Sequence, residues 1–138
     1  MNAQERGIME FHIFDNPAGV HSTRGYSHAV RMGDLVFVSG QVAQNQQGEI
    51  VGKGDPKAQA EQIYRNLEAV LTACGSGLDR IGKMNILITN PDHLPAIREV
   101  RDRVFAPIGH VPASTLAVIS RLAHPDYLVE IEVVAAPR

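Results

Sequence analysis

The stretch DPKAQAEQIYRNLEAVLTACG, residues 55–75, has the clearest structural pattern in the chain. Asp55 followed by Pro56 is typical of a helix start, because an aspartate caps the first turn and proline fits the first helical position. Gly75 ends the pattern. The stretch therefore predicts an amphipathic helix with one face in a hydrophobic core. The apolar residues that recur at helical spacing are Ile63, Leu67, Val70, Leu71 and Cys74.

The residues that precede this helix predict three strands. Residues 10–14 alternate polar and apolar side chains until Asp15-Asn16-Pro17 interrupts the run. Residues 27–32 and 35–42 are two β-rich segments around a Gly33-Asp34 turn, and the second begins with four apolar residues. We therefore expect a short first strand and a hairpin whose second strand is buried.

The residues that follow the helix complete an α+β pattern. Residues 81–89 carry Ile86, Leu87 and Ile88 without helical spacing, which predicts another buried strand. Residues 94–105 combine an apolar stripe with opposite charges three and four residues apart, which predicts a second, solvated helix. Residues 113–120 and 127–135 predict two last strands. We expect one α+β domain over residues 1–138, with a mixed six-stranded sheet and two helices on one face.

Length and composition exclude several classes of protein. The 138 residues suffice for one domain with its own core, and 44% hydrophobic and 20% charged residues are ordinary for a globular protein. A net charge of -2 does not favour nucleic-acid binding. The single cysteine excludes an internal disulfide, and no segment has the apolar character of a signal peptide or a membrane span. We expect a cytoplasmic protein with no nucleic-acid or membrane partner.

Two helices on one face leave the other face of the sheet uncovered, and self-association is the simplest way to cover it. In the last strand, Val129, Ile131 and Val133 alternate with Glu130 and Glu132. The first set belongs to the core. Carboxylates are rarely buried without partners, so the second set faces either solvent or a polar cleft.

Few residues indicate chemistry by themselves. The chain lacks the motifs of serine hydrolases, zinc proteases, phosphate-binding loops and dinucleotide-binding folds. Its six histidines have no spacing that predicts a metal site, and Cys74 is best interpreted as core packing. The segment Ser39-Gly40-Gln41 is different, because glycine at the end of a strand marks a β-bulge or allows a ligand to approach the backbone.

Six segments occur in an order that is informative as a set: Gly25-Tyr26-Ser27, LVFVSGQV (residues 35–42), Asn66-Leu67, the strand-turn-helix after Lys83, VPAST (residues 111–115) and VEIEVVA (residues 129–135). Together they resemble the Rid family (YjgF/YER057c/UK114), known for reactive imine and enamine deaminases. The resemblance covers about residues 25–138 and implies the chorismate-mutase-like fold. It also implies a homotrimer with a central barrel and the helices outside.

The resemblance further implies a site in a cleft between subunits, without a metal or organic cofactor. Glu130 matches the catalytic carboxylate that holds the hydrolytic water, and Tyr26, Ser39 and Gly40 match positions that contact the substrate. Ser114 stands where the deaminating members have an arginine that binds the substrate carboxylate in a bidentate pair. Leu116 stands at the family's reactive cysteine position, so thiol chemistry is not implied.

Two functions remain open. The first is an enzyme, a deaminase or hydrolase of a small imine, enamine or related reactive amine, in which Glu130 positions water. The second is a non-catalytic trimer that binds a metabolite or regulates a partner and has lost imine deaminase activity. Ser114 weakens the standard activity of the family without deciding between a changed substrate and a lost one.

Overall fold

The computed structural model describes residues 7–138, and these form the expected order of elements. The strands are β1 (Phe11–Phe14), β2 (Ala29–Met32), β3 (Leu35–Gln41), β4 (Ile81–Ile88), β5 (Ala113–Val118) and β6 (Val129–Ala135). The helices are α1 (Pro56–Ala73) and α2 (Leu94–Phe105), and the short 3-10 turns Leu78–Arg80 and Pro91–His93 precede β4 and α2. Each predicted element is present, with ends that differ by one or two residues.

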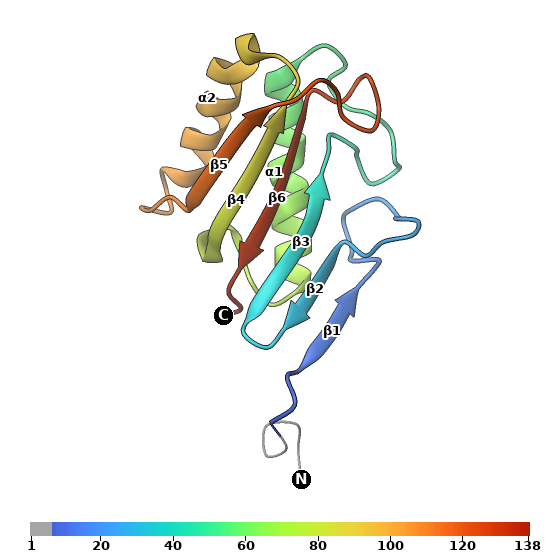
Figure 1. Cartoon of the computed structure of the whole chain (residues 1–138), viewed down its shortest axis with the longest axis vertical. Helices are drawn as coiled ribbons and strands as arrows, with labels where there is room; N and C mark the ends of the chain where they lie inside the picture. The colour runs from blue at the N-terminus through green and yellow to red at the C-terminus, as the bar shows by residue number, and fades with distance from the viewer. Residues whose placement is uncertain (1–6) are drawn as a thin grey trace.

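The six strands form one mixed sheet in the order β1-β2-β3-β6-β4-β5, and both helices lie on one face of it (Figure 1). Neighbouring strands are antiparallel except β4 and β5, which are parallel and are connected through α2. A parallel pair requires a crossover of this kind. The prediction of an α+β sheet with two helices on one face is confirmed.

The start and the buried face of α1 also follow the prediction. The side chain of Asp55 accepts a hydrogen bond from the Ala58 N–H (3.1 Å), a cap that typically stabilises a helix by about 1 kcal/mol. At the other end of the helix, Cys74 is buried in the core, and burial raises the pKa of its thiol to about 11. Cys74 is therefore a packing residue, as expected.

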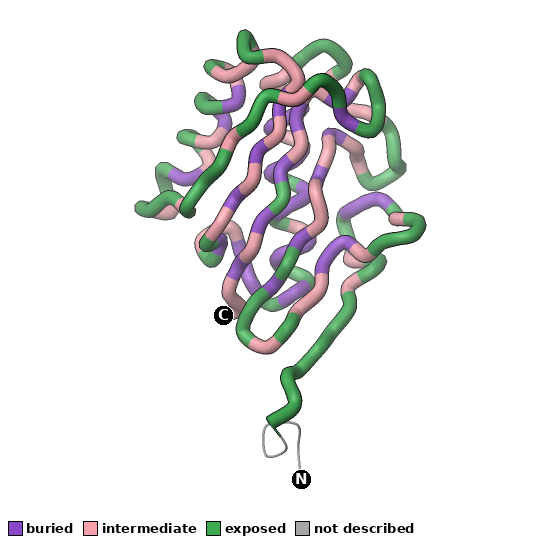
Figure 2. The backbone as a smooth tube through the Cα atoms, in the orientation of Figure 1, coloured by how far each residue is buried: buried purple, intermediate pink, exposed green. Residues whose placement is uncertain are grey.

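The prediction of a buried β3 is wrong for the single chain. Exposure alternates along this strand: Val36 and Val38 are buried, whereas Leu35 is 47% and Phe37 is 37% exposed. The same alternation runs along β4 and β6, as Figure 2 shows. The helices cover only one face of the sheet, so every second side chain lies outside the core even where the sequence is continuously apolar.

The face of the sheet opposite the helices, called here the helix-free face, has an apolar half and a polar half. The strand pairings place six large apolar side chains on the β1–β3 half: Phe11, Ile13, Val30, Met32, Leu35 and Phe37. The half formed by β4, β5 and β6 carries five polar side chains beside Leu87 and Val134: Lys83, Asn85, Thr115, Glu130 and Glu132. The predicted division of β6, with valine and isoleucine inward and two glutamates outward, is confirmed.

Candidate functional site

Four of the five residues predicted for the site lie at one end of the sheet. Tyr26 is in the loop before β2. Ser39 and Gly40 are the third-last and second-last residues of β3, and Glu130 is the second residue of β6. Because β3 is antiparallel to both β2 and β6, its end adjoins their starts. Burial raises the pKa of Tyr127, just before β6, and the phenol of Tyr26 raises it further.

A β-bulge occupies Ser39 and Gly40. Val38 pairs with Val133 but Gln41 pairs with Ile131, so β3 has one residue more than β6 in this interval. The bulge interpretation of the Ser39-Gly40-Gln41 segment is confirmed.

The group that approaches the backbone of this bulge is the side chain of Glu130. A Cβ atom added to Gly40 would lie only 2.6 Å from Oε2 and 2.7 Å from Cδ of Glu130. Residue 40 therefore has to be glycine for the carboxyl group to lie where it does.

Glu130 is a half-buried carboxyl group with a perturbed pKa. Burial raises this pKa, and the neighbouring carboxylate of Glu132 raises it further. Glu132 itself is exposed and accepts a hydrogen bond from Nδ2 of Asn85 (2.9 Å). The raised pKa of Glu130 lets this carboxyl group exchange protons closer to neutral pH.

The polar groups of Ser39 are all engaged by neighbouring residues. Its N–H donates to the carbonyl oxygen of His28 (2.9 Å), and its hydroxyl donates to that of Ser27 (2.6 Å). Its own carbonyl oxygen accepts from Nε2 of Gln41 (3.0 Å). The hydroxyl proton is thus committed within the protein, and the Ser39 hydroxyl can only accept a hydrogen bond from a ligand.

A buried polar cluster next to the bulge was not predicted from the sequence. His28 and Gln41 are each 1% exposed, and Nε2 of Gln41 donates to Nδ1 of His28 (3.2 Å). Nε2 of His28 donates to the carbonyl oxygen of His21 (2.7 Å), and the two histidine rings meet edge to face, 5.0 Å between centroids. His21 and His28 lie outside the helices and strands, so no periodic spacing could have indicated their contact.

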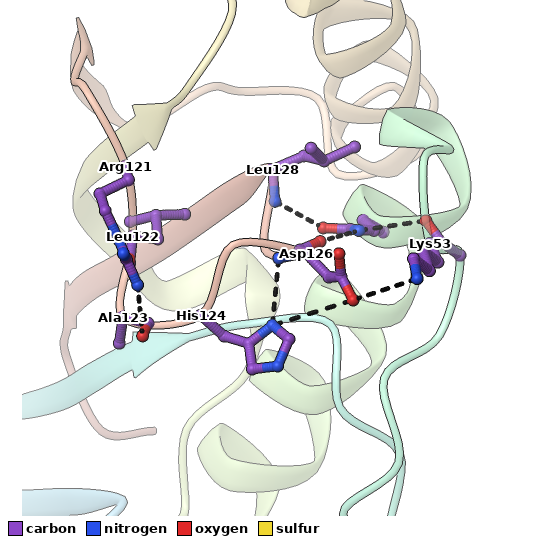
Figure 3. Close-up of polar contacts among 9 residues, drawn as sticks. Lys53, Arg121, Leu122, Ala123, His124, Asp126 and Leu128 are labelled. Carbon is purple, nitrogen blue, oxygen red and sulfur yellow. Dashed lines mark hydrogen bonds and ion pairs between the residues drawn. The ribbon is translucent and has the colours of Figure 1, made fainter.

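The start of β6 is held from the helix side by Gln59 of α1. Oε1 of Gln59 accepts from the Leu128 N–H (2.9 Å), and its Nε2 donates to the carbonyl oxygen of Asp126 (2.8 Å). Figure 3 shows this segment, in which Lys53 also forms an ion pair with the carboxylate of Asp126. Leu128 is two residues before Glu130, so this anchor fixes the backbone from which the carboxyl group extends.

The fifth predicted residue, Ser114, lies apart from the other four within one chain. It pairs with Met84 and, like Leu116, is on the side of the sheet that faces the helices. It is also near the start of β5, which is at the opposite end of the sheet from the start of β6. Ser114 and Glu130 are therefore on different faces and at different ends of the sheet.

A groove of about 320 Å³ crosses the helix-free face beside the bulge. Ser39, Lys83, Asn85 and Glu132 form its polar walls, and the ammonium group of Lys83 donates to the hydroxyl of Thr115 (2.6 Å). The groove thus offers both an ammonium group and a carboxylate to a small polar molecule.

Other features of the described chain do not add a site. Among residues 7–138, no group of three or more histidine, cysteine, aspartate or glutamate side chains is placed to hold a metal ion. Arg101 of α2 pairs with Asp102, and Arg103 pairs with Glu61 of α1, both at 2.7 Å, as expected for a solvated helix face. Within the same residues, no helix is sufficiently long and apolar to cross a bilayer.

Comparisons with known proteins match most of the chain. The family model described as Endoribonuclease L-PSP matches residues 17–137. Protein HMF1 of Saccharomyces cerevisiae is 33% identical over 113 residues, which cover 82% of this chain and 84% of HMF1. The 2-iminobutanoate/2-iminopropanoate deaminase of Dermatophagoides farinae is 32% identical over 93 residues, which cover 67% of this chain and 73% of that protein.

Solved structures resemble this fold over almost their whole length. The crystal structure of E. coli TdcF with bound serine has a TM-score of 0.83 at 29% identity, covering 92% of this chain and 99% of TdcF. The crystal structure of YEO7_yeast has a TM-score of 0.85 at 29% identity, covering 94% of this chain and 100% of the yeast chain.

Proposed function

The chain belongs to the YjgF/Rid family, since the Endoribonuclease L-PSP model spans residues 17–137, and we propose that it is a deaminase or hydrolase of small imines, enamines or related reactive amines. The observation that carries this proposal is the half-buried carboxyl group of Glu130 over the glycine bulge. The relative named 2-iminobutanoate/2-iminopropanoate deaminase supports the reaction class. A net charge of -2 does not favour an RNA substrate.

The proposed reaction requires a placed water molecule and a group that accepts and returns a proton. The carboxylate of Glu130 takes a proton from water while the water oxygen bonds to the imine carbon and the C=N π electrons pass to nitrogen, which then takes that proton from the Glu130 carboxyl group. The Glu130 carboxylate next takes the hydroxyl proton of the carbinolamine and passes it to nitrogen, so that a carbonyl group forms as the C–N bond breaks and ammonia leaves. Because burial raises the pKa of Glu130, its carboxylate is a stronger base than that of an exposed glutamate.

Ser114 supports a substrate that lacks a carboxylate next to the imine. A serine hydroxyl has neither the positive charge nor the two parallel donors of the guanidinium group that the deaminating members have at this position. Loss of such a contact costs about 2 to 4 kcal/mol in a water-poor site, or roughly 30- to 1,000-fold in kcat/KM. We therefore expect slow turnover of 2-iminopropanoate and similar α-imino acids.

The proposed site is shared between the subunits of a homotrimer. Within one chain, Ser114 and Glu130 lie on opposite faces of the sheet, so they line one cleft only if two copies contribute. The helix-free face also exposes large apolar side chains that a second copy would cover, including Phe11, Ile13 and Leu35. In the proposed enzyme, a second copy therefore covers the exposed apolar side chains and completes the site.

A comparison of Glu130→Gln with Glu132→Gln tests the proposed function. A flavin amine oxidase generates a neutral imine in situ, and semicarbazide traps the imine that the protein does not hydrolyse. We expect the wild type and Glu132→Gln to hydrolyse the imine at similar rates, and Glu130→Gln to lose about 100-fold or more in kcat. Full activity of Glu130→Gln would refute the role of Glu130.

The same assay also decides between the enzyme and the alternative function. If the wild-type protein hydrolyses neither neutral nor carboxylate-bearing imines, Ser114 marks a lost activity. The trimer would then be a metabolite-binding or regulatory protein that keeps the cleft of the family.

A further inference from the structure

The hydrogen bonds around His28 are consistent with only one placement of protons. Nε2 of Gln41 lies 3.0 Å from the carbonyl oxygen of Ser39 and 3.2 Å from Nδ1 of His28. A carbonyl oxygen can only accept, so the NH₂ group of Gln41 has to face these two atoms. Nδ1 of His28 is then an acceptor, and its Nε2 carries the proton donated to the carbonyl oxygen of His21. His28 therefore accepts a hydrogen bond through Nδ1 and donates one through Nε2.

This orientation leaves part of the cluster unpaired. Oε1 of Gln41 and Nδ1 of His21 are buried and have no hydrogen-bond partner among the described residues. Buried polar atoms are usually paired, and an amide that only stabilised the core would be expected to use its oxygen as well as its nitrogen. The amide of Gln41 is thus oriented for its contacts to His28 and to the bulge, although this orientation leaves its own oxygen without a hydrogen bond.

These contacts fix the backbone on which the proposed site depends. The carbonyl oxygen of His28 accepts from the N–H of Ser39 (2.9 Å), and the His28 ring orients the amide of Gln41 that holds the carbonyl oxygen of Ser39. The next residue, Gly40, is the one over which the Glu130 carboxyl group lies. We propose that His28 is a positioning residue, which acts through Gln41 on the Ser39–Gly40 bulge and so fixes the place of the Glu130 carboxyl group.

Two variants of His28 distinguish positioning from packing. His28→Gln retains an amide donor for His21 and an amide oxygen that accepts from Gln41, whereas His28→Leu fills a similar volume and offers neither. Ser76→Ala is the matched control. Ser76 is buried, and its hydroxyl donates to the carbonyl oxygen of Ala136 (2.7 Å), just past the far end of β6.

The first measurement is the pKa of Glu130, followed by NMR through its side-chain carboxyl carbon in the full chain. We expect His28→Leu to lower this pKa toward that of an exposed glutamate, because a relaxed bulge lets water reach the carboxyl group. His28→Gln and Ser76→Ala should retain it.

The second measurement rests on the proposed function and uses the neutral imine generated by the amine oxidase. We expect His28→Leu to lower kcat by about 10- to 100-fold with KM changed by less than about threefold, because a displaced catalytic group slows the chemical step. The conservative variant His28→Gln should restore most of kcat.

The outcomes separate this inference from the proposed function. An unchanged pKa of Glu130 in folded His28→Leu overturns the positioning role, whatever the activity. If His28→Leu does not fold, Gln41→Met removes the amide at similar volume and gives the same test. A lowered pKa together with full activity of Glu130→Gln would support the positioning role and overturn the proposed function.

Discussion

Gly40→Ala should disable the proposed site while leaving the protein folded. Gly40 does not have the positive φ that favours glycine, so its backbone can accommodate alanine. The added Cβ would lie 2.6 Å from Oε2, 2.7 Å from Cδ and 2.9 Å from Cγ of Glu130, all atoms of one flexible side chain. Because non-bonded carbon contacts normally lie at about 3.5 to 4.0 Å, the carboxyl group has to move by roughly 1 Å.

This displacement has a small effect on stability and a large effect on function. Moving a side chain away from its preferred rotamer costs about 0.5 to 1.5 kcal/mol, against a typical unfolding free energy of about 5 to 15 kcal/mol. The midpoint of thermal unfolding should therefore fall by only about 2 to 5 °C. A catalytic group misplaced by about 1 Å can slow a reaction about 100-fold, and we expect a loss of that size in kcat for Gly40→Ala.

The matched control for this variant is Gly82→Ala in β4, where a Cβ would meet only the carbonyl oxygen of Val134, at 3.8 Å. Both variants are assayed by semicarbazide trapping and by calorimetry, beside Glu130→Gln and the double variant Gly40→Ala/Glu130→Gln. If Gly40 acts only by making room for the carboxyl group, the double variant is no slower than Glu130→Gln alone. A folded Gly40→Ala protein with full activity would refute the reasoning.

Three further predictions concern pH, assembly and specificity. Because the pKa of Glu130 is raised on folding, the folded state binds this proton more tightly, and stability falls as the pH rises from the ordinary glutamate value through the raised one. In thermal unfolding, the stability of Glu130→Gln relative to the wild type should thus be greater at neutral pH than at acidic pH. The same stability difference between the two proteins at acidic and at neutral pH would contradict this. Light scattering at micromolar concentration should give three times 15.0 kDa, whereas a monomeric mass would argue against both the trimer and the shared site. Ser114→Arg should raise kcat/KM for 2-iminopropanoate relative to a neutral imine by about 30-fold, and no change would place residue 114 outside contact with the substrate carboxylate.

The fold was predictable because local patterns and the core agree. The helix α1 begins at the Asp55-Pro56 cap that the sequence indicates. Along β6, the residues that the alternating sequence assigns to the core are the ones that are buried. Burial of β3 was not predictable, because the apolar residues 35–38 fit a strand covered on both faces. Leu35 and Phe37 instead extend from the face without helices. The sequence shows that these side chains need cover, but not whether the same chain or a second copy provides it.

The site was only partly predictable, because it depends on strand register and on irregular backbone. The closeness of Glu130 to Gly40 follows from the extra residue that β3 has between Val38 and Gln41, which is visible only once β3 is paired with β6. The contact between residues 21 and 28 could not be predicted either, because both residues lie in loops, whose sequence has no periodic pattern.

The face occupied by Ser114 is likewise set by the register of β5. Ser114 pairs with Met84 and so faces the helices, whereas a shift of one residue would turn it to the helix-free face beside Lys83. The observed register means that an arginine or a serine at position 114 cannot contact a ligand held by Glu130 of the same chain. The chemical consequence of serine at this position therefore depends on how two copies meet, and Ser114→Arg can alter specificity only if the edge strand β5 of one copy approaches the bulge of another.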